Sequence, residues 1–156
     1  MPLNIRLATQ ADKPAINELR KQVKLVHAAG RPDFFSEGFD EASADYLNVM
    51  MMQENAELFV ADRDGAIVGF AFLEYIDRPA TPYRIATQYC HIAEFGVDER
   101  YRRQGIGTAL FDRVKACAAE KGYRRMELGM WEFNESALRF YESVGFHTYK
   151  RNLEYP

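Results

Sequence analysis

Cysteine is scarce in this sequence, and long apolar runs are absent. The 156 residues include two cysteines, Cys90 and Cys117, which are too few for a disulfide framework and lie in apolar stretches typical of buried free thiols. No stretch approaches the roughly 18 uncharged apolar residues of a membrane-spanning helix. The beginning, MPLNIRLATQ, also lacks the apolar segment of a secretion signal. We therefore expect a soluble cytoplasmic protein with no membrane partner.

An excess of positive charge and a metal-ligand cluster are missing as well. The formal net charge is −3 at pH 7 and the isoelectric point is near 5.7, whereas a general nucleic-acid binder usually shows a basic face. We therefore expect no nucleic-acid partner. Any contact with phosphate should be confined to one short segment of the chain. His27 and His147 have no cysteine, histidine or carboxylate neighbour at metal-ligand spacing, which predicts structural or surface roles and no metal site.

Hydrophobic residues are plentiful, at 47% of the chain, and favour one compact domain over residues 1–156. The order of elements is read from the spacing of apolar residues. In the first half this spacing predicts a strand over 3–8, a helix with Thr9 as N-cap, a loop over 28–40 and a second helix over 41–53. Asp64-Gly65, between two β-rich runs within 56–76, predicts an antiparallel hairpin.

The second half alternates strands and helices. The pattern predicts a strand over 86–97, a helix over 107–121, a strand over 124–131, a helix over 134–146 with Asn134 as N-cap, and a last strand over 147–155. Such alternation implies at least one right-handed parallel crossover. Because the first half is antiparallel, we expect a mixed sheet in an α/β (α+β) fold.

The stretch RRQGIGTAL, residues 102–110, lies between a predicted strand and a predicted helix. Free backbone N–H groups and the positive end of the helix dipole form an anion site at such a place. No Gly-Lys-Ser/Thr follows, and Leu110 stands where a dinucleotide fingerprint has its third glycine, so both common nucleotide motifs are excluded. A tight turn without a ligand is the alternative. Arginines at 100, 102 and 103 favour a diphosphate.

Two motifs in this half resemble those of the GNAT superfamily of acetyl-CoA-dependent N-acetyltransferases. Arg102, Gly105 and Gly107 match the family's Arg/Gln-x-x-Gly-x-Gly/Ala signature. NESALRFYESVGF is similar to its second motif, in which an asparagine opens a helix and a tyrosine precedes Glu-x-x-Gly-Phe. The resemblance implies the GNAT fold: a mostly antiparallel mixed sheet of about six or seven strands, about four flanking helices, and parallel strands that splay at the cofactor site.

The resemblance also implies where acetyl-CoA binds. The backbone amides of residues 102–108, here called the phosphate loop, would hold the pyrophosphate of coenzyme A. The end of the preceding strand would pair with the pantetheine arm. The residues so implied are Arg102, Arg103, Gln104, Gly105, Ile106, Gly107 and Thr108 in the loop, Phe95, Gly96 and Val97 in the strand, and Asn134 and Tyr141 in the second motif. The amide of Val97 would polarise the thioester carbonyl. Asn134 is equally expected to be only an N-cap.

Acetyl transfer by direct attack requires a neutral amine, and a lysine-like amine with a pKa of about 10.4 is mostly charged at neutral pH. Tyr141, as the family's usual general acid, would protonate the leaving thiolate, unless it only packs in the core. A chain of water molecules or a side chain is expected to accept the proton, and the side chains considered are Glu94, slightly preferred, and His91. Strand alternation places these two on opposite faces unless a bulge intervenes. The glutamate that some relatives carry five residues before the asparagine is Gly129 here.

The acceptor amine is expected to meet the segments that vary around this common site. The loop over 27–40 carries three phenylalanines together with Asp33, Glu37 and Asp40, a mixture that suits an amine with an apolar body, although the acids are as readily explained as solvated loop charges. Met130 and Trp131 are expected in the core rather than in the acceptor pocket. The acceptor class, a small-molecule amine or a protein amine, stays open.

Two other functions are compatible with the same motifs. One is an acyl-CoA-binding sensor without turnover, and the other is a phosphate-binding or protein-interaction domain that keeps only the fold. The last predicted strand, with Tyr149, Leu153 and Tyr155, presents an apolar edge that makes a homodimer plausible.

Overall fold

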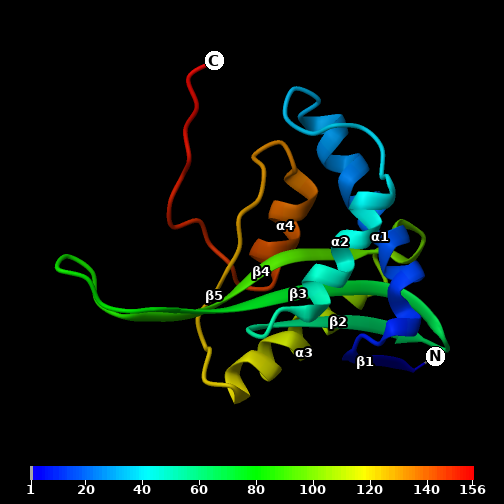
Figure 1. Ribbon diagram of the computed structural model, residues 1–156, viewed down its shortest axis with the longest axis horizontal. Coiled ribbons are helices and arrows are strands. Elements are labelled where there is room, and N and C mark those ends of the chain that lie inside the picture. The colour runs from blue at the N-terminus through cyan, green and yellow to red at the C-terminus, as the bar shows by residue number, and fades with distance from the viewer. Residues whose placement is uncertain (1) are drawn as a thin grey trace.

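The computed structural model describes residues 2–156. Its central sheet has five strands in the order β1-β2-β3-β4-β5, antiparallel except for the last pair (Figure 1). The expected mixed, mostly antiparallel sheet is confirmed, with one strand fewer than the lower end of the expected range. The strands are β1 (Leu3–Leu7), β2 (Ala56–Arg63), β3 (Ala66–Arg78), β4 (Thr87–Val97) and β5 (Met126–Glu127).

Helices cover both faces of the sheet. They are α1 (Lys13–Gly30), α2 (Glu41–Met52), α3 (Ile106–Glu120) and α4 (Glu135–Ser143), with short 3₁₀ helices at Gln10–Asp12 and Glu99–Tyr101. Alternate side chains of a strand point to opposite faces. Phe70 and Phe72 of β3 accordingly pack with α1 and α2, whereas Ala71 and Leu73 pack with α3. The sheet therefore has two apolar layers, one on each side.

The hairpin between β2 and β3 forms where it was predicted. Asp64 and Gly65 have φ angles of 52° and 88°. Positive φ at both central residues is the signature of the type I′ turn, whose twist matches that of the flanking strands. This local signal was sufficient to predict both strands.

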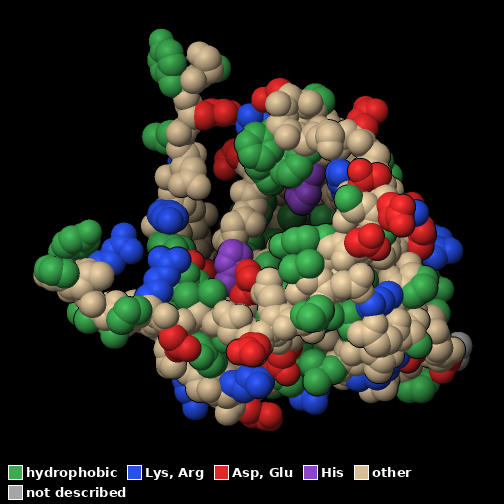
Figure 2. Space-filling model, in the orientation of Figure 1, with side chains coloured by type: hydrophobic (Ala, Val, Ile, Leu, Met, Phe, Trp, Pro, Cys, Tyr) green, Lys and Arg blue, Asp and Glu red, His purple; other side chains and the backbone are tan. Residues whose placement is uncertain are grey.

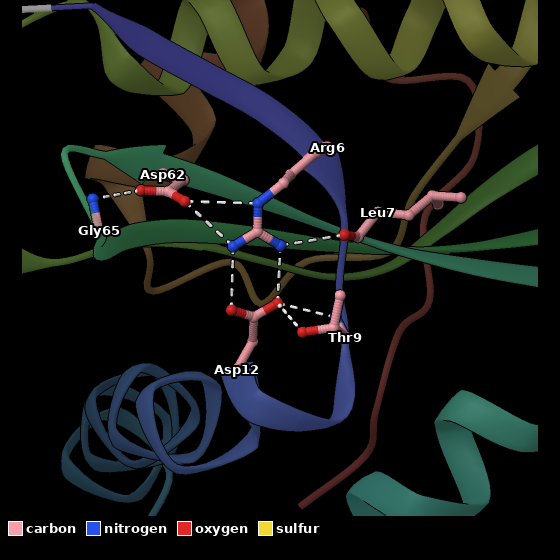
Figure 3. A network of polar contacts seen from close by, with 6 residues as sticks. All are labelled: Arg6, Leu7, Thr9, Asp12, Asp62 and Gly65. Atoms are coloured by element: carbon pink, nitrogen blue, oxygen red, sulfur yellow. Dashed lines mark hydrogen bonds and ion pairs between the residues drawn. The ribbon is translucent and has the colours of Figure 1, made fainter.

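A buried carboxylate anchors the start of α1 to the sheet (Figure 3). The Arg6 guanidinium donates to Asp12 at 2.7 and 3.0 Å and to Asp62 at 3.0 Å. Asp12 also accepts the Thr9 N–H at 2.7 Å. Hydrogen bonds from Arg6 lower the pKa of Asp12 to about 2. Thr9, the predicted N-cap, thus begins a 3₁₀ turn that leads directly into α1.

The predicted strand over 147–155 is wrong. After α4 the chain runs on without pairing to the sheet (Figure 1, red), and the side chains of Leu153 and Tyr155 are 92% and 100% exposed. The preceding strand is also shorter than expected, because β5 pairs with β4 at only two positions. The chain then leaves the sheet, so it offers the C-terminal segment no edge of useful length.

In residues 2–156, no helix combines the length and the apolar character needed to cross a membrane. The part of the chain that the structure describes also lacks any group of three or more histidine, cysteine, aspartate or glutamate side chains placed to hold a metal ion.

Candidate active site

A cavity of about 1000 Å³ opens at the end of β4, between α1 and α2 on one side and the start of α3 and α4 on the other. Figure 2 shows the face that is hollowed between α1 and α4. One end of the cavity is lined by the predicted phosphate loop. The other end is lined by Glu94 and by side chains of α1 and α2.

The cavity exists because β4 and β5 diverge. Their parallel pairing comprises Cys90 with Met126 and His91 with Glu127, after which β4 continues to Val97 with that edge free. Asp98 donates its N–H to Val68 on the β3 side at 2.8 Å. Because alternate residues direct their N–H groups to opposite neighbours, Phe95 and Val97 direct theirs to the free edge. The expected splay of parallel strands is confirmed, and its free edge borders the cavity.

The phosphate loop presents free backbone donors to the same cavity. Gly105, with φ 79°, is the N-cap of α3 and has no side chain to cap the helix. In the first hydrogen bond of α3, the Ala109 N–H donates to the Gly105 carbonyl at 3.0 Å. The N–H groups of residues 106–108 precede it and have no intrahelical acceptor. The arrangement suits an anion with several oxygens.

The side chains around this loop divide between the cavity and the outside. Arg102 and Arg103 line the cavity. The Gln104 side chain accepts a hydrogen bond from Arg63 at 2.7 Å, and Gln104 is not among the described residues that line the cavity. Arg100, expected among the phosphate-binding arginines, instead donates to the buried carboxylate of Asp98 at 2.7 Å. That pair lowers the pKa of Asp98 and fixes the turn ahead of the loop.

A β-bulge decides the orientation of the two candidate bases. Phe72 pairs with Glu94 and Leu73 with Ile92, so the register skips Ala93. Glu94 and His91 therefore share the α1 face of the sheet, and strict alternation, which separates them, is wrong here. Among the described residues that line the cavity, Glu94 is present and His91 is not.

Glu94 lies against a buried arginine of α1. Arg20 is 9% exposed, and its Nε lies 3.6 Å from Glu94 Oε1. Burial raises the pKa of Glu94, and the charge of Arg20 opposes that rise. A carboxylate with a raised pKa is a better proton acceptor than an exposed one, provided that it is still ionised.

Tyr141 and Asn134 reach the cavity from α4. Tyr141 packs edge-on against Phe95 and Phe140, with ring centroids at 6.2 and 5.3 Å, and it lines the cavity as well. Tyr141 therefore packs in an aromatic cluster and also forms part of the cavity wall. Burial raises the pKa of Tyr141 to about 12. Asn134 caps α4, since its Oδ1 accepts the Ala137 N–H at 3.1 Å, and it also lines the cavity.

Two glycines of the predicted site are required by packing. A Cβ at Gly107 would lie 3.0 Å from the Phe140 ring, and a Cβ at Gly96 would lie 3.0 Å from both Phe70 and Val23. These approaches are closer than side chains normally tolerate. The glycines therefore let α4 and α1 pack against the walls of the cavity.

Comparison with known proteins decides the family of this chain. The model of the acetyltransferase (GNAT) family matches residues 24–146. The chain belongs to this family. Its fold and family are those of acyltransferase enzymes.

Individual relatives extend the comparison. L-ornithine N5-acetyltransferase NATA1 of Arabidopsis thaliana is 29% identical over 125 residues, which cover 80% of this chain and 52% of the relative. The chain spans about half the length of the curated relatives it matches first. The tetramutant of the BH1408 protein from Bacillus halodurans is 26% identical, with a TM-score of 0.94 over 98% of this chain and 99% of that one.

A more distant solved structure shares the fold. Aminoglycoside N-acetyltransferase AAC(6')-Iy, in complex with CoA, is 18% identical and has a TM-score of 0.77 over 99% of this chain and 94% of that chain.

The end of this GNAT cavity beyond Glu94 is walled by aromatic rings. Phe34 and Phe35 contact Trp131 at centroid distances of 4.8 and 5.3 Å, and His27 stacks on Phe35 at 5.1 Å. His27 lines the cavity, and its stacking on Phe35 agrees with a structural role. Met130 and Trp131 also line the cavity, so their expected core position is wrong. The reason is the early end of β5, which turns the following segment into a wall.

The acidic residues of the loop before α2 serve other contacts. Asp33 accepts hydrogen bonds from Arg31 at 2.9 Å, and Asp40 caps α2 by accepting the Ser43 N–H at 2.8 Å. Glu37 is exposed. None of the three is among the described residues that line the cavity. Their expected role in attracting the amine is not supported by their positions.

Sequence analysis missed the cavity residues of α1 and α2. Arg20, Lys24 and Tyr46 line the cavity. One signal for Arg20 was available, because it lies within the apolar stripe that includes Ile16 and Leu19. A charged residue in such a stripe is buried only when it has a partner. Its partner, Glu94, is far away in the sequence and could not be identified from spacing.

Proposed function

We propose that this protein transfers the acetyl group of acetyl-CoA to a primary amine by direct attack in a ternary complex. The observation that carries the proposal is the continuity of the cavity, which runs from the phosphate loop along the free edge of β4 to Glu94. Two substrates can thus lie end to end, with the reacting atoms near the middle. Such positioning is itself a large part of the catalysis of a bimolecular reaction.

The residues present fit coenzyme A. The N–H groups of residues 106–108 with Arg102 and Arg103 would hold the pyrophosphate, and the free N–H groups of Phe95 and Val97 would pair with the pantetheine amides. The CoA complex of AAC(6')-Iy, which has the same fold, supports this placement. The Val97 N–H is then suited to polarise the thioester carbonyl.

Glu94 is the base that the geometry favours. It lines the cavity, whereas His91 lies farther back on β4. Glu94 would accept the proton of the ammonium, directly or through a water molecule. The neutral nitrogen then attacks the thioester carbon, the C–N bond forms, and the C–S bond breaks with the electron pair leaving on sulfur. The attacking nitrogen releases its second proton to solvent and becomes the amide N–H.

Tyr141 would stabilise the departing sulfur. Since its pKa is about 12, the phenol keeps its proton throughout the working range of pH. A thiol with a pKa of about 8.5 is the stronger acid, so hydrogen-bond donation to the thiolate is favoured over complete proton transfer. The CoA thiolate then takes the one proton that it needs from solvent.

Two measurements test the proposal. Acetyl-CoA and a set of small amines and peptides are incubated with the protein, and acetylated products are identified by mass spectrometry. NATA1, named for acting on L-ornithine, supports including amino acids. Initial rates with both substrates varied should give intersecting lines, as a ternary complex requires. Tight binding of acetyl-CoA without any product would instead identify an acyl-CoA sensor.

We also propose a homodimer in the cytoplasm. The exposed apolar side chains of the C-terminal segment, Leu153 and Tyr155, and the free thiols of Cys90 and Cys117 support these two expectations. Light scattering after size exclusion, for wild type and for Leu153→Glu, tests the dimer. A monomeric wild type at micromolar concentration would contradict it.

A further inference from the structure

The charges at the acceptor end of the cavity are unexpected for a site that receives only a cation. Among the described residues lining this end, Glu94 is the one carboxylate, and Arg20 and Lys24 are both cationic. A polyamine would meet more positive than negative charge here, which disfavours its binding. The balance instead favours an acceptor that also carries negative charge.

Arg20 is already engaged by the protein. Its Nη1 donates to Asn17 Oδ1 and to the Ser43 carbonyl, both at 2.9 Å, and its Nε faces Glu94. The Arg20 charge is thus largely compensated. A second cation, Lys24, remains at this end of the cavity.

Lys24 is half-buried and makes no ion pair within residues 2–156. Its charge helps to lower the pKa of Asp40 in the loop before α2. The Asp40 carboxylate is exposed to solvent and accepts both the N–H and the hydroxyl of Ser43. The Lys24 ammonium therefore keeps its donors for a ligand.

Helix geometry places Lys24 on the acceptor side and away from the phosphate loop. Gln22 faces the turn ahead of that loop, because its Oε1 accepts the Glu99 N–H at 3.0 Å. Two residues along a helix correspond to about 200° of rotation, so Lys24 faces away from that turn, toward α2. It follows Arg20 by four residues, about 6 Å along the axis. Tyr46 of α2 lines the same end of the cavity.

We propose that the acceptor is an amino carboxylate, such as an amino acid, whose carboxylate binds the Lys24 ammonium and the Tyr46 hydroxyl while its amine lies at Glu94. This inference rests on the proposed acetyl transfer and names the class of its acceptor. An ammonium and a carboxylate in a half-buried site form a charge-assisted hydrogen bond. The aromatic wall of Phe35, Phe39 and Trp131 holds the apolar part of the same molecule.

The test compares amines that differ only by a carboxylate. The pairs are L-phenylalanine with 2-phenylethylamine, 4-aminobutyrate with propylamine, and L-ornithine with putrescine, all with acetyl-CoA. The measured quantity is the ratio of kcat/KM within each pair. We expect the carboxylate member of at least one pair to be preferred, and Lys24→Gln to lower that ratio about tenfold, the size expected for one charge-assisted hydrogen bond. Lys115→Gln, an exposed lysine of α3, should keep the wild-type ratio.

The possible failures are distinguishable. If the amines without a carboxylate are acetylated equally well, or if Lys24→Gln leaves the ratio unchanged, the acceptor class is wrong although acetyl transfer stands. If no amine of any kind is acetylated, the proposed function itself is wrong and this inference is overturned with it. For each protein, both amines of a pair are measured with the same preparation. A partial loss of folded protein therefore lowers both rates equally and leaves their ratio unchanged.

Discussion

Arg20 Nε lies 3.6 Å from Glu94 Oε1, and the two side chains join α1 to the end of β4 at the wall of the cavity. The Nε has no hydrogen-bond partner among the described residues, although it is buried. Burial favours the protonated form of the carboxyl, and the cation favours its ionised form. For Glu94 as the proposed base, this balance would set the pH range in which it accepts a proton.

Replacing Arg20 by Gln should move the acidic limb of the kcat/KM profile to higher pH. The charge of Arg20 lowers the pKa of Glu94, so its removal leaves the burial effect unopposed and raises that pKa. The base is then ionised only at higher pH. Rates measured across the pH range test this shift. Arg20→Lys, which keeps a cation, should restore most of the wild-type profile, and a profile that does not move in Arg20→Gln would contradict the coupling.

Glu94→Gln should lower kcat/KM by about 100-fold, the usual contribution of a general base. His91→Gln is the matched control on the same face of β4, and it should retain the wild-type rate and pH profile. Both are measured with saturating acetyl-CoA. The opposite result, loss of the acidic limb in His91→Gln alone, would transfer the role of base to His91.

Tyr141→Phe should lower kcat about tenfold or more, because the departing sulfur loses one hydrogen-bond donor. The affinity for CoA, measured by calorimetry, should change little. In the wild type, ionisation of Tyr141 should not reduce the rate until the pH approaches 12. Tyr123→Phe removes an exposed hydroxyl bonded to Asp77 and serves as control. An unchanged kcat in Tyr141→Phe would exclude the proposed role.

Arg102→Ala combined with Arg103→Ala should weaken acetyl-CoA binding about tenfold or more, since each charge-assisted contact to a phosphate contributes on this scale. Binding of free pantetheine should be unaffected, because it has no pyrophosphate. Calorimetric titration of both ligands measures the difference. Arg113→Ala, an exposed residue of α3 outside the cavity lining, is the control. Equal weakening for both ligands would place these arginines elsewhere than at the pyrophosphate.

Asp12→Asn should lower the free energy of unfolding by about 2 kcal/mol at neutral pH, as follows from a pKa lowered from 3.8 to about 2. A lowered pKa stabilises the fold above the unfolded value and ceases to do so as the pH falls through the folded value. The difference between wild type and variant should therefore shrink between about pH 4 and pH 2. Urea unfolding at several pH values measures it, with the exposed Asp45→Asn as control. A difference independent of pH would show that Arg6 does not hold the charge of Asp12.

Local signals carried much of the prediction. The turn at Asp64-Gly65, the cap at Asn134 and the loop after Arg102 depend on hydrogen bonds and φ angles within a few residues, and all three formed as expected. Family membership was recognised from the same short motifs. Turns, caps and anion loops are readable in a sequence because their partners are neighbours along the chain.

Tertiary structure alone decided the rest of the site. The bulge at Ala93 placed Glu94 and His91 on one face, and the short β5 left the C-terminal segment without a strand to pair with. The pairing of Arg20 with Glu94 joins residues far apart in the chain. Register, strand ends and buried charge pairs are set by competition among distant surfaces. The sequence by itself thus determined the family and the position of the loop before α3, and packing determined which side chains line the cavity.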